Sequence, residues 1–296
     1  MSDSMTSANP KRPIILKNCV CVYCGEPRPS DQMTKEHVVG RRFVPKGTLD
    51  GNWNLIVGAC ERCNGEKSDL EDDISAITML PDVTGQYAHD EAQIVRIAER
   101  KASGAISRHT GRLVGESREE LTLKSRLGAD ISMSFGFIGH PHIDDERAFR
   151  LARMQLTAFF FWISYDSGKC RGYYWPDGFH PVMLARKEDW GNARIIAFAD
   201  AVKTWQPRIS ATTAEGFFKL AMRRHPTAAC WSWAIEWNRT ARLIGFVGDQ
   251  TVAEEAIASL PQLDTKVVSQ GPSLVVRLRP EQALDPSKDQ LFAFSD

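Results

Sequence analysis

Residues 60–67 read CERCNGEK, in which Cys60 and Cys63 are three positions apart and Asn64 and Lys67 follow. A CxxC pair at the start of a helix can be a redox pair, half of a metal site or a chance spacing in a buried segment. The segment CVYCG, about 35 residues upstream, holds a second pair. Two such pairs at this separation are typical of four thiolates that bind one zinc ion tetrahedrally. We therefore predict a structural Zn²⁺ site formed by Cys21, Cys24, Cys60 and Cys63.

The cysteine count also bears on the compartment in which the protein works. The chain of 296 residues has seven cysteines, and its polar amino terminus lacks the apolar stretch of a secretory signal. Both features argue against a disulfide framework and predict a cytoplasmic protein. Cys19 is a nearby thiol that could replace Cys21 in the metal site, but its spacing is less suitable.

The composition is typical of a soluble globular protein, with 43% hydrophobic and 25% charged residues. No segment approaches the roughly 18 uncharged apolar residues that a membrane span requires, so we predict no membrane contact. The formal net charge is zero. Global electrostatics therefore neither supports nor excludes a polyanionic partner.

Hydrophobic periodicity predicts an α+β protein with several defined elements. Residues 90–101 form an amphipathic pattern, and residues 146–164, preceded by Asp144 and Asp145, predict a capped helix that is apolar nearly all round in its last two turns. Residues 121–137 and 273–278 are strand-like, and 251–260 form a short alanine-rich helix. A hairpin is predicted from residues 230–236 and 242–247, in which Trp231, Trp233 and Trp237 occupy one buried strand face.

These patterns divide the chain into four parts. They are a flexible tail at 1–17, a small zinc-stapled unit at 18–86, a helix and basic connector at 87–120, and a larger accessory α+β domain of unknown role at 121–296. The accessory part has seven of the eight tryptophans, so we expect it to contain the main hydrophobic core.

The residues around and between the cysteine pairs resemble the HNH endonucleases of the ββα-metal type, in the branch with a four-cysteine zinc site. Three pieces carry the resemblance over roughly residues 19–69: Glu36-His37 opening a strand, Asn54-Leu55 opening a second strand, and the 60–67 segment on the closing helix. The resemblance implies a metal-dependent hydrolase that nicks or cuts double-stranded DNA.

The same resemblance implies a role for each motif residue. His37 would be the general base, Glu36 and Asn64 would bind the catalytic divalent cation, and Asn54 would brace the loop that orients His37. Mg²⁺ is the foremost candidate for that cation, with Mn²⁺ or Ni²⁺ as alternatives. Glutamate at position 36 stands where aspartate or histidine is more usual. Because neighbouring strand residues point to opposite faces, Glu36 and His37 share a site only if the chain bends between them.

Basic residues near the motif are candidates for contacts to DNA phosphates. Arg41 and Arg42 lie in the loop between the two predicted strands, and Lys67 lies one helical turn beyond Cys63. Further basic residues follow, namely Lys46, Arg96, Arg100, Lys101, Arg108 and Arg112. Such residues neutralise phosphates without reading sequence, but an ordinary solvated surface is the other interpretation.

Two other functions remain open at the level of sequence. One is a zinc-ribbon nucleic-acid-binding protein without catalysis, and the other is a nuclease effector gated by a ligand-sensing carboxy-terminal domain. That domain could also bind a partner or hold a homodimer. His140 and His142 have no third ligand nearby in sequence, so we interpret them as loop residues.

Overall fold

The computed structural model describes residues 11–82, 84–88, 91–126, 132–175, 178–270 and 275–293. Helices and strands are mixed along the chain, which confirms the α+β class. The first elements are β1 (Ile14–Ile15), β2 (Thr34–His37), β3 (Leu55–Ala59), α1 (Glu61–Thr78), α2 (Ala92–Ala102), β4 (Arg118–Arg126) and β5 (Ser132–Pro141). The later elements are α3 (Asp145–Ile163), β6 (Phe179–Arg186), α4 (Ala193–Val202), β7 (Gln206–Thr213), β8 (Phe218–Arg224), β9 (Cys230–Trp237), β10 (Ala241–Gly248), α5 (Gln250–Ser259), β11 (Lys266–Gln270) and β12 (Val275–Leu278). Short 3₁₀ helices occupy Ser30–Gln32, Val114–Glu116, Lys187–Asp189, Ala214–Gly216 and Pro286–Lys288.

A small sheet followed by a helix positions the motif residues. β2 pairs antiparallel with β3, β1 pairs parallel with the other edge of β3, and α1 begins two residues after β3 ends. The second strand starts directly after Asn54, as predicted, whereas Glu36 and His37 close β2 rather than open it. β1 also lies inside the segment predicted as a tail, because Ile14 and Ile15 take the free edge of β3. Residues 1–10 of that tail lie outside the described part.

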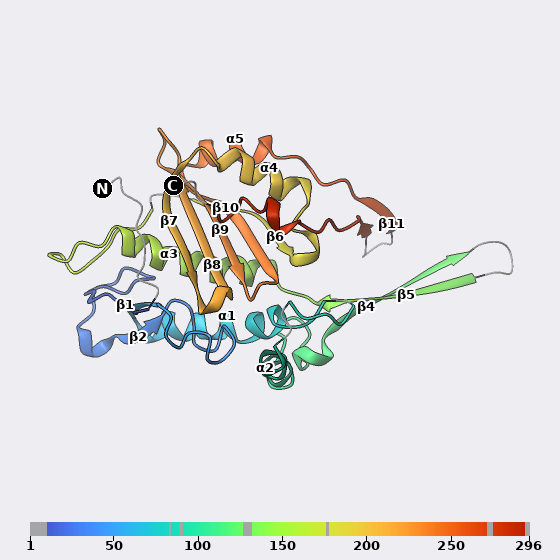
Figure 1. Cartoon of the computed structure of the whole chain (residues 1–296), viewed down its shortest axis with the longest axis horizontal. Helices are drawn as coiled ribbons and strands as arrows, with labels where there is room; N and C mark the ends of the chain where they lie inside the picture. Colours follow the sequence, from blue (N-terminus) through green and yellow to red (C-terminus); the bar gives the residue numbers. More distant parts are fainter. Residues whose placement is uncertain are drawn as a thin grey trace.

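A five-stranded antiparallel sheet, in the order β6-β10-β9-β8-β7, forms the centre of the molecule (Figure 1). One face packs on α3, where Phe160 meets Trp231 edge to face and the Gln155 side chain accepts a hydrogen bond from Trp237. The other face packs on α4 and α5 through a second cluster that includes Phe198, Phe246 and Ala253. The prediction that Trp231, Trp233 and Trp237 are buried is confirmed, and all three belong to the cluster that contains α3.

Two of the predicted element boundaries have visible local causes. Of the two predicted cap residues, Asp144 and Asp145, it is Asp144 that caps α3, because its side chain accepts a hydrogen bond from the Arg147 backbone N–H at 2.9 Å. The predicted hairpin is also present as β9 and β10. Its turn places Asn238 and Arg239 at φ of 51° and 60°, and the Thr240 N–H closes the turn on the Trp237 carbonyl. Two consecutive positive φ values match the twist of the flanking strands.

The amino-terminal part shares its hydrophobic core with the central sheet and α3. Phe43 contacts Trp237 with ring centroids 5.4 Å apart, and Trp53 contacts Phe159 at 6.2 Å. The Trp53 indole also donates to the Thr212 carbonyl at 2.8 Å. One cluster of buried side chains therefore runs from residue 20 to residue 247. The boundary predicted between residues 120 and 121 falls inside β4.

Two hairpins complete the fold. β4 and β5 form a long antiparallel pair that extends away from the body, and β11 pairs with β12 (Figure 1). The segment predicted as strand-like at 121–137 is therefore two strands, with 127–131 outside the described residues. The strand predicted at 273–278 corresponds to β12, with 273 and 274 outside that part. None of the described helices combines the length and apolar character needed to cross a bilayer.

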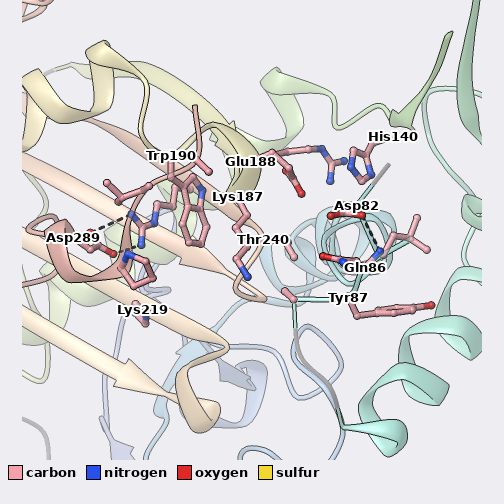
Figure 2. A pocket seen from close by; sticks show the side chains of 17 residues that line it. Asp82, Gln86, Tyr87, His140, Lys187, Glu188, Trp190, Lys219, Thr240 and Asp289 are labelled. Atoms are coloured by element: carbon pink, nitrogen blue, oxygen red, sulfur yellow. Dashed lines mark hydrogen bonds and ion pairs between the residues drawn. The ribbon is translucent and has the colours of Figure 1, made fainter. Parts of the chain in front are cut away.

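A cavity of about 380 Å³ lies where the segment after α1 approaches the β9–β10 turn (Figure 2). Its other lining residues come from the ends of β5 and β6, the 3₁₀ helix after β6, strands β8 and β10, and the chain beyond residue 282. The cavity is thus bounded by segments that are distant in sequence.

Candidate functional site

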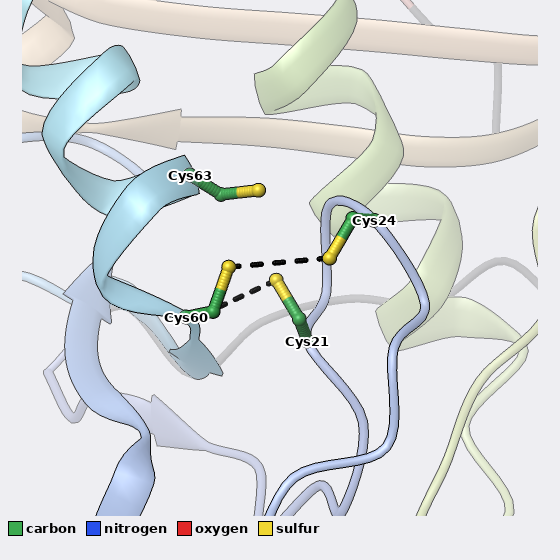
Figure 3. A group of neighbouring side chains, drawn as sticks. All are labelled: Cys21, Cys24, Cys60 and Cys63. Atoms are coloured by element: carbon green, nitrogen blue, oxygen red, sulfur yellow. Dashed lines mark hydrogen bonds between the residues drawn. The ribbon is translucent and has the colours of Figure 1, made fainter.

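The four predicted cysteines converge at the start of α1 (Figure 3). The sulfur atoms of Cys21, Cys24, Cys60 and Cys63 lie within 4.8 Å of one another, and those of Cys24 and Cys60 are 3.9 Å apart. Thiolates bound tetrahedrally to zinc at about 2.3 Å would be roughly 3.8 Å apart. The donor set and its spacing therefore fit a metal ion such as zinc.

Local structure explains why these four side chains meet. The Gly25 N–H bonds the Cys21 carbonyl at 2.9 Å, and Gly25 adopts φ of 74°, a left-handed conformation that favours glycine. This turn presents the first two sulfurs on one side. Cys60 is the N-cap of α1 and Cys63 lies in its first turn. The Cys60 backbone N–H donates to the Cys21 sulfur at 3.3 Å, which joins the two halves.

The thiols of the group differ in how readily they ionise, because burial raises the pKa of Cys21 and of Cys63, whereas the pKa of Cys60 is lowered. Burial alone would raise the pKa of its thiol, but hydrogen bonds from the Cys63 backbone and from the other thiols lower the pKa to about 7. Cys19 does not belong to the group of four. Its sulfur lies 3.5 Å from the Lys169 carbonyl instead, so the assignment of Cys21 rather than Cys19 agrees with the structure.

Asn54 fixes the chain that follows His37. Its amide donates to the Val39 carbonyl at 2.7 Å, and its carbonyl accepts from the Val39 N–H at 3.2 Å. The side chain is only 6% exposed. A buried side chain that satisfies both backbone groups of one residue holds that residue in a single position. The segment at 38–39 is therefore anchored to the start of β3.

Lys67 is buried, which corrects the prediction that it contacts DNA phosphate. The side chain is 1% exposed, and its ammonium lies 2.8 Å from Glu36 and 2.5 Å from Glu71. It also donates to the His37 backbone carbonyl at 3.2 Å. Burial opposes the charged form, but the two carboxylates outweigh this effect and raise the pKa of Lys67. A lysine enclosed in this way cannot extend to a phosphate in solvent.

Glu36 belongs to the same buried network. Its Oε1 accepts hydrogen bonds from Lys67 and, at 3.1 Å, from the Tyr23 hydroxyl. Burial, followed by the charges of Glu36 and Glu71, raises the pKa of Tyr23 well above its ordinary value, so the phenol keeps its proton. Oε2 of Glu36 makes no hydrogen bond to any described residue. One oxygen of the carboxylate is therefore engaged and the other is available.

The Asn64 side chain is hydrogen-bonded to Thr34 in β2. Its amide donates to the Thr34 hydroxyl at 2.9 Å, and its carbonyl oxygen has no partner among the described residues. Thr34 and Glu36 are two positions apart in β2 and therefore share the strand face that α1 covers. Amide and carboxylate oxygens are both ligand types that hard divalent cations take.

His37 is half-buried at the end of β2. Within the described part of the chain, its Nε2 atom is buried and has no hydrogen-bond partner. Burial first, and the nearby Arg41 charge second, lower the pKa of the imidazole and favour its neutral form. No hydrogen bond among the described residues joins the side chains of Glu36, His37 and Asn64 to one another. The structure thus places all three around β2 and α1 without direct contact.

The predicted basic residues differ in their surroundings. Arg41 and Arg42 are exposed in the loop that joins β2 to β3. Lys101 instead donates to the Arg42 backbone carbonyl, and burial lowers its pKa to about 8. Arg108 pairs with Asp69 on α1. The last two residues therefore secure α2 and the connector to the motif rather than forming a free basic surface.

Sequence reasoning missed the buried charges and one histidine pair. The i, i+4 spacing of Lys67 and Glu71 was a signal for an ion pair, but nothing in the sequence showed that β2 and Tyr23 would enclose it. His142 packs against His109 with ring centroids 4.6 Å apart, an arrangement that links residues 33 positions apart. No local pattern could reveal that contact.

No protein-family model, curated protein or solved structure matches the chain. The resemblance to HNH endonucleases therefore rests on the motif residues themselves.

Proposed function

We propose that the chain is a metal-dependent endonuclease that hydrolyses phosphodiester bonds of double-stranded DNA. The observation that carries the proposal is the Asn54 clamp on Val39, because it immobilises the residues directly after His37. Two strands and a helix anchored by four cysteines surround that clamp. Activation of water requires a neutral imidazole and oxygen ligands for a cation, and β2 and α1 carry both kinds of group.

Each residue has a distinct role in this proposal. His37 accepts the proton of the attacking water. Glu36 and Asn64 hold a divalent cation, for which Mg²⁺ is the foremost candidate and Mn²⁺ or Ni²⁺ are alternatives. That cation, when bound, would neutralise the charge that develops on the phosphate. Lys67 orients Glu36 through their ion pair, and the exposed Arg41 and Arg42 contact the DNA backbone.

The direct test is cleavage of supercoiled plasmid by the purified protein with Mg²⁺, Mn²⁺ or Ni²⁺. We expect nicked or linear DNA from the wild type and a loss of about 10²–10⁴-fold in rate for His37→Ala, the usual contribution of a general base. His109→Ala is the matched control, since it removes an imidazole outside the site. Identical products from wild type and His37→Ala under every metal would contradict catalysis at this site.

A binding protein without catalysis is the second candidate. The ion pair between Glu36 and Lys67 favours it, because that pair already engages one oxygen of the carboxylate. This candidate predicts DNA binding that persists in EDTA together with no cleavage in any metal. A gel-shift assay run beside the plasmid assay separates the two functions.

A further inference from the structure

Three cysteines lie outside the metal group, and two of these three are neighbours in space. Cys230 is buried in β9, whereas Cys19 is exposed and Cys170 is half-buried. The Cys19 backbone N–H donates to the Cys170 carbonyl at 2.8 Å. The fold therefore brings together two accessible thiols that are far apart in sequence.

The distance between these two cysteines suits a covalent bond. Residues joined by backbone hydrogen bonds in a strand pair have Cα atoms about 5.5 Å apart, and disulfides join Cα atoms separated by about 4.4–6.8 Å. The Cys19 sulfur lies 3.5 Å from the Lys169 carbonyl, so its side chain points toward the turn that contains Cys170. The Cys170 sulfur lies 3.5 Å from the Ser167 carbonyl of the same turn, and both thiols are free. Rotation of the two side chains can therefore bring the sulfurs together.

The turn that carries Cys170 is held by its own hydrogen bonds. Asp166 and Arg171 pair as an antiparallel bridge, and the Asp166 side chain accepts from the backbone N–H groups of Gly168 at 2.9 Å and Lys169 at 3.2 Å. Cys170 itself adopts φ of 50°, a left-handed conformation that few residues other than glycine take. A turn fixed in this way keeps the Cys170 backbone in one position.

The chain that follows this turn also contacts the metal group. The Tyr174 hydroxyl donates to the Cys21 carbonyl at 2.8 Å, and a Cβ atom on Gly25 would lie 3.4 Å from the Tyr174 ring. Cys21 is only two residues from Cys19, but its side chain has no exposed surface and belongs to the metal group. Cys170 is therefore the accessible partner for Cys19.

We propose that Cys19 and Cys170 form a reversible disulfide when the protein meets hydrogen peroxide. The peroxide O–O bond breaks as one thiol is oxidised to a sulfenic acid, and one water leaves. The second sulfur then attacks the sulfenic sulfur, so that the S–S bond forms and the hydroxyl group leaves as a second water. Two thiol hydrogens and two electrons thus reduce one peroxide to two waters.

This bond would be a single reversible link and not a disulfide framework. In a reducing compartment such bonds are transient and serve as redox sensors. The link joins the chain that enters the metal group to the turn after α3, and it leaves the four metal-binding sulfurs unchanged. The proposal does not depend on nuclease activity.

The test is treatment of the zinc-loaded full chain with hydrogen peroxide, followed by alkylation of the remaining thiols, digestion with trypsin and mass spectrometry. Trypsin places Cys19 in the peptide 18–35 and Cys170 in the peptide 170–171. We expect the two peptides to be joined, with the loss of two hydrogens, and to separate after reduction by dithiothreitol. Cys19→Ser and Cys170→Ser should each abolish the joined product. Cys230→Ala is the matched control, because it removes the third thiol outside the metal group and should form the bond as readily as the wild type.

A second readout shows whether the bond fits the native fold. Oxidation should raise the melting temperature of the wild type by about 5 °C or more, because the bond closes a long loop in the unfolded chain. The same treatment should leave the melting temperature of Cys170→Ser unchanged.

Three results would overturn the proposal. The first is the absence of joined peptides after peroxide treatment. The second is a joined product that persists in Cys19→Ser, which would place the bond on Cys21 or Cys24. The third is an oxidised wild type whose melting temperature stays equal or falls, since the bond would then form only by distorting the fold. Failure of the plasmid assay leaves this test unaffected.

Discussion

Lys67 is the residue whose surroundings depart furthest from its sequence context. A lysine one turn after a CxxC pair is expected at the surface, but Glu36 and Glu71 enclose it. Its ammonium also bonds the His37 carbonyl, so one side chain holds a strand end, a helix and a candidate catalytic residue together. Removing the charge would leave two buried carboxylates facing each other.

We expect Lys67→Met to destabilise the protein by about 3–5 kcal/mol, the usual cost of leaving a buried charge without its partner. Urea denaturation measures this change. Lys46→Met is the control, since Lys46 is exposed in the loop between β2 and β3. Adding Glu36→Gln and Glu71→Gln to Lys67→Met should recover part of the loss. A single variant as stable as the wild type would show that the network contributes nothing.

The second prediction at the residue scale concerns zinc binding by the four cysteines. Cys60→Ser should abolish bound zinc, measured by metal mass spectrometry, because serine is a poor zinc ligand. The melting temperature should fall by about 10 °C or more, since a structural metal stabilises only the folded state. Cys19→Ser changes a neighbouring thiol outside the group and should keep one zinc per chain. Equal metal content in both variants would refute the site.

At the scale of elements, the sequence predicted those helices and strands that short local patterns define, such as a capping side chain or alternating apolar residues. Asp144 capped α3 as expected, and the alternation of Trp231, Trp233 and Trp237 identified a buried strand. The cysteine pairs converged because a short spacing limits where four sulfurs can go. The order of strands in the central sheet had no such signal, because it depends on pairings between residues far apart. The burial of Lys67 could not be predicted either, because it depends on Tyr23 and Glu36, which are distant from Lys67 in sequence.

The β9–β10 turn gives a test at this scale. The Asn238 amide donates to the Phe43 carbonyl at 3.1 Å and to the Thr78 hydroxyl at 2.8 Å, so the turn joins the central sheet to α1. We expect Asn238→Gly to cost about 2–3 kcal/mol through the lost hydrogen bonds. Asn238→Ala should cost about 1 kcal/mol more, because alanine resists the positive φ at this position.

Chemical denaturation of the two variants separates the contributions. Glycine keeps the backbone conformation and removes only the side-chain bonds, whereas alanine changes both. Equal stability of the glycine variant and the wild type would mean that the turn does not tie the two parts together. Equal stability of the two variants would mean that the positive φ carries no strain for alanine.

At the scale of the whole molecule, the shared core decides how the chain can be divided. Phe43 and Trp53 belong to the amino-terminal part, but their partners Trp237 and Phe159 lie beyond residue 120. Ion pairs between Arg147 on α3 and two aspartates of α1 cross the same boundary. The metal motif is therefore embedded in the fold and lacks a core of its own.

We expect a chain that ends at residue 120 to fail to unfold cooperatively, even with zinc present. It keeps all four cysteines, β1 to β3 and α1, but it exposes Phe43 and Trp53 to water. Thermal denaturation followed by circular dichroism, together with the dispersion of an amide NMR spectrum, measures this. A sharp transition would contradict the shared core and would restore the prediction of a separate unit at 18–86.

The separation of these aromatic partners has a consequence for synthesis. At ~5–20 residues per second, Trp53 leaves the ribosome on the order of 10–40 s before Trp237. The nascent motif can capture zinc in that interval, because its four sulfurs all emerge early. The apolar surface of the motif stays exposed to water until Phe159 and Trp237 have been synthesised. A translational pause between residues 80 and 150 would therefore leave the nascent chain open to chaperone binding or aggregation.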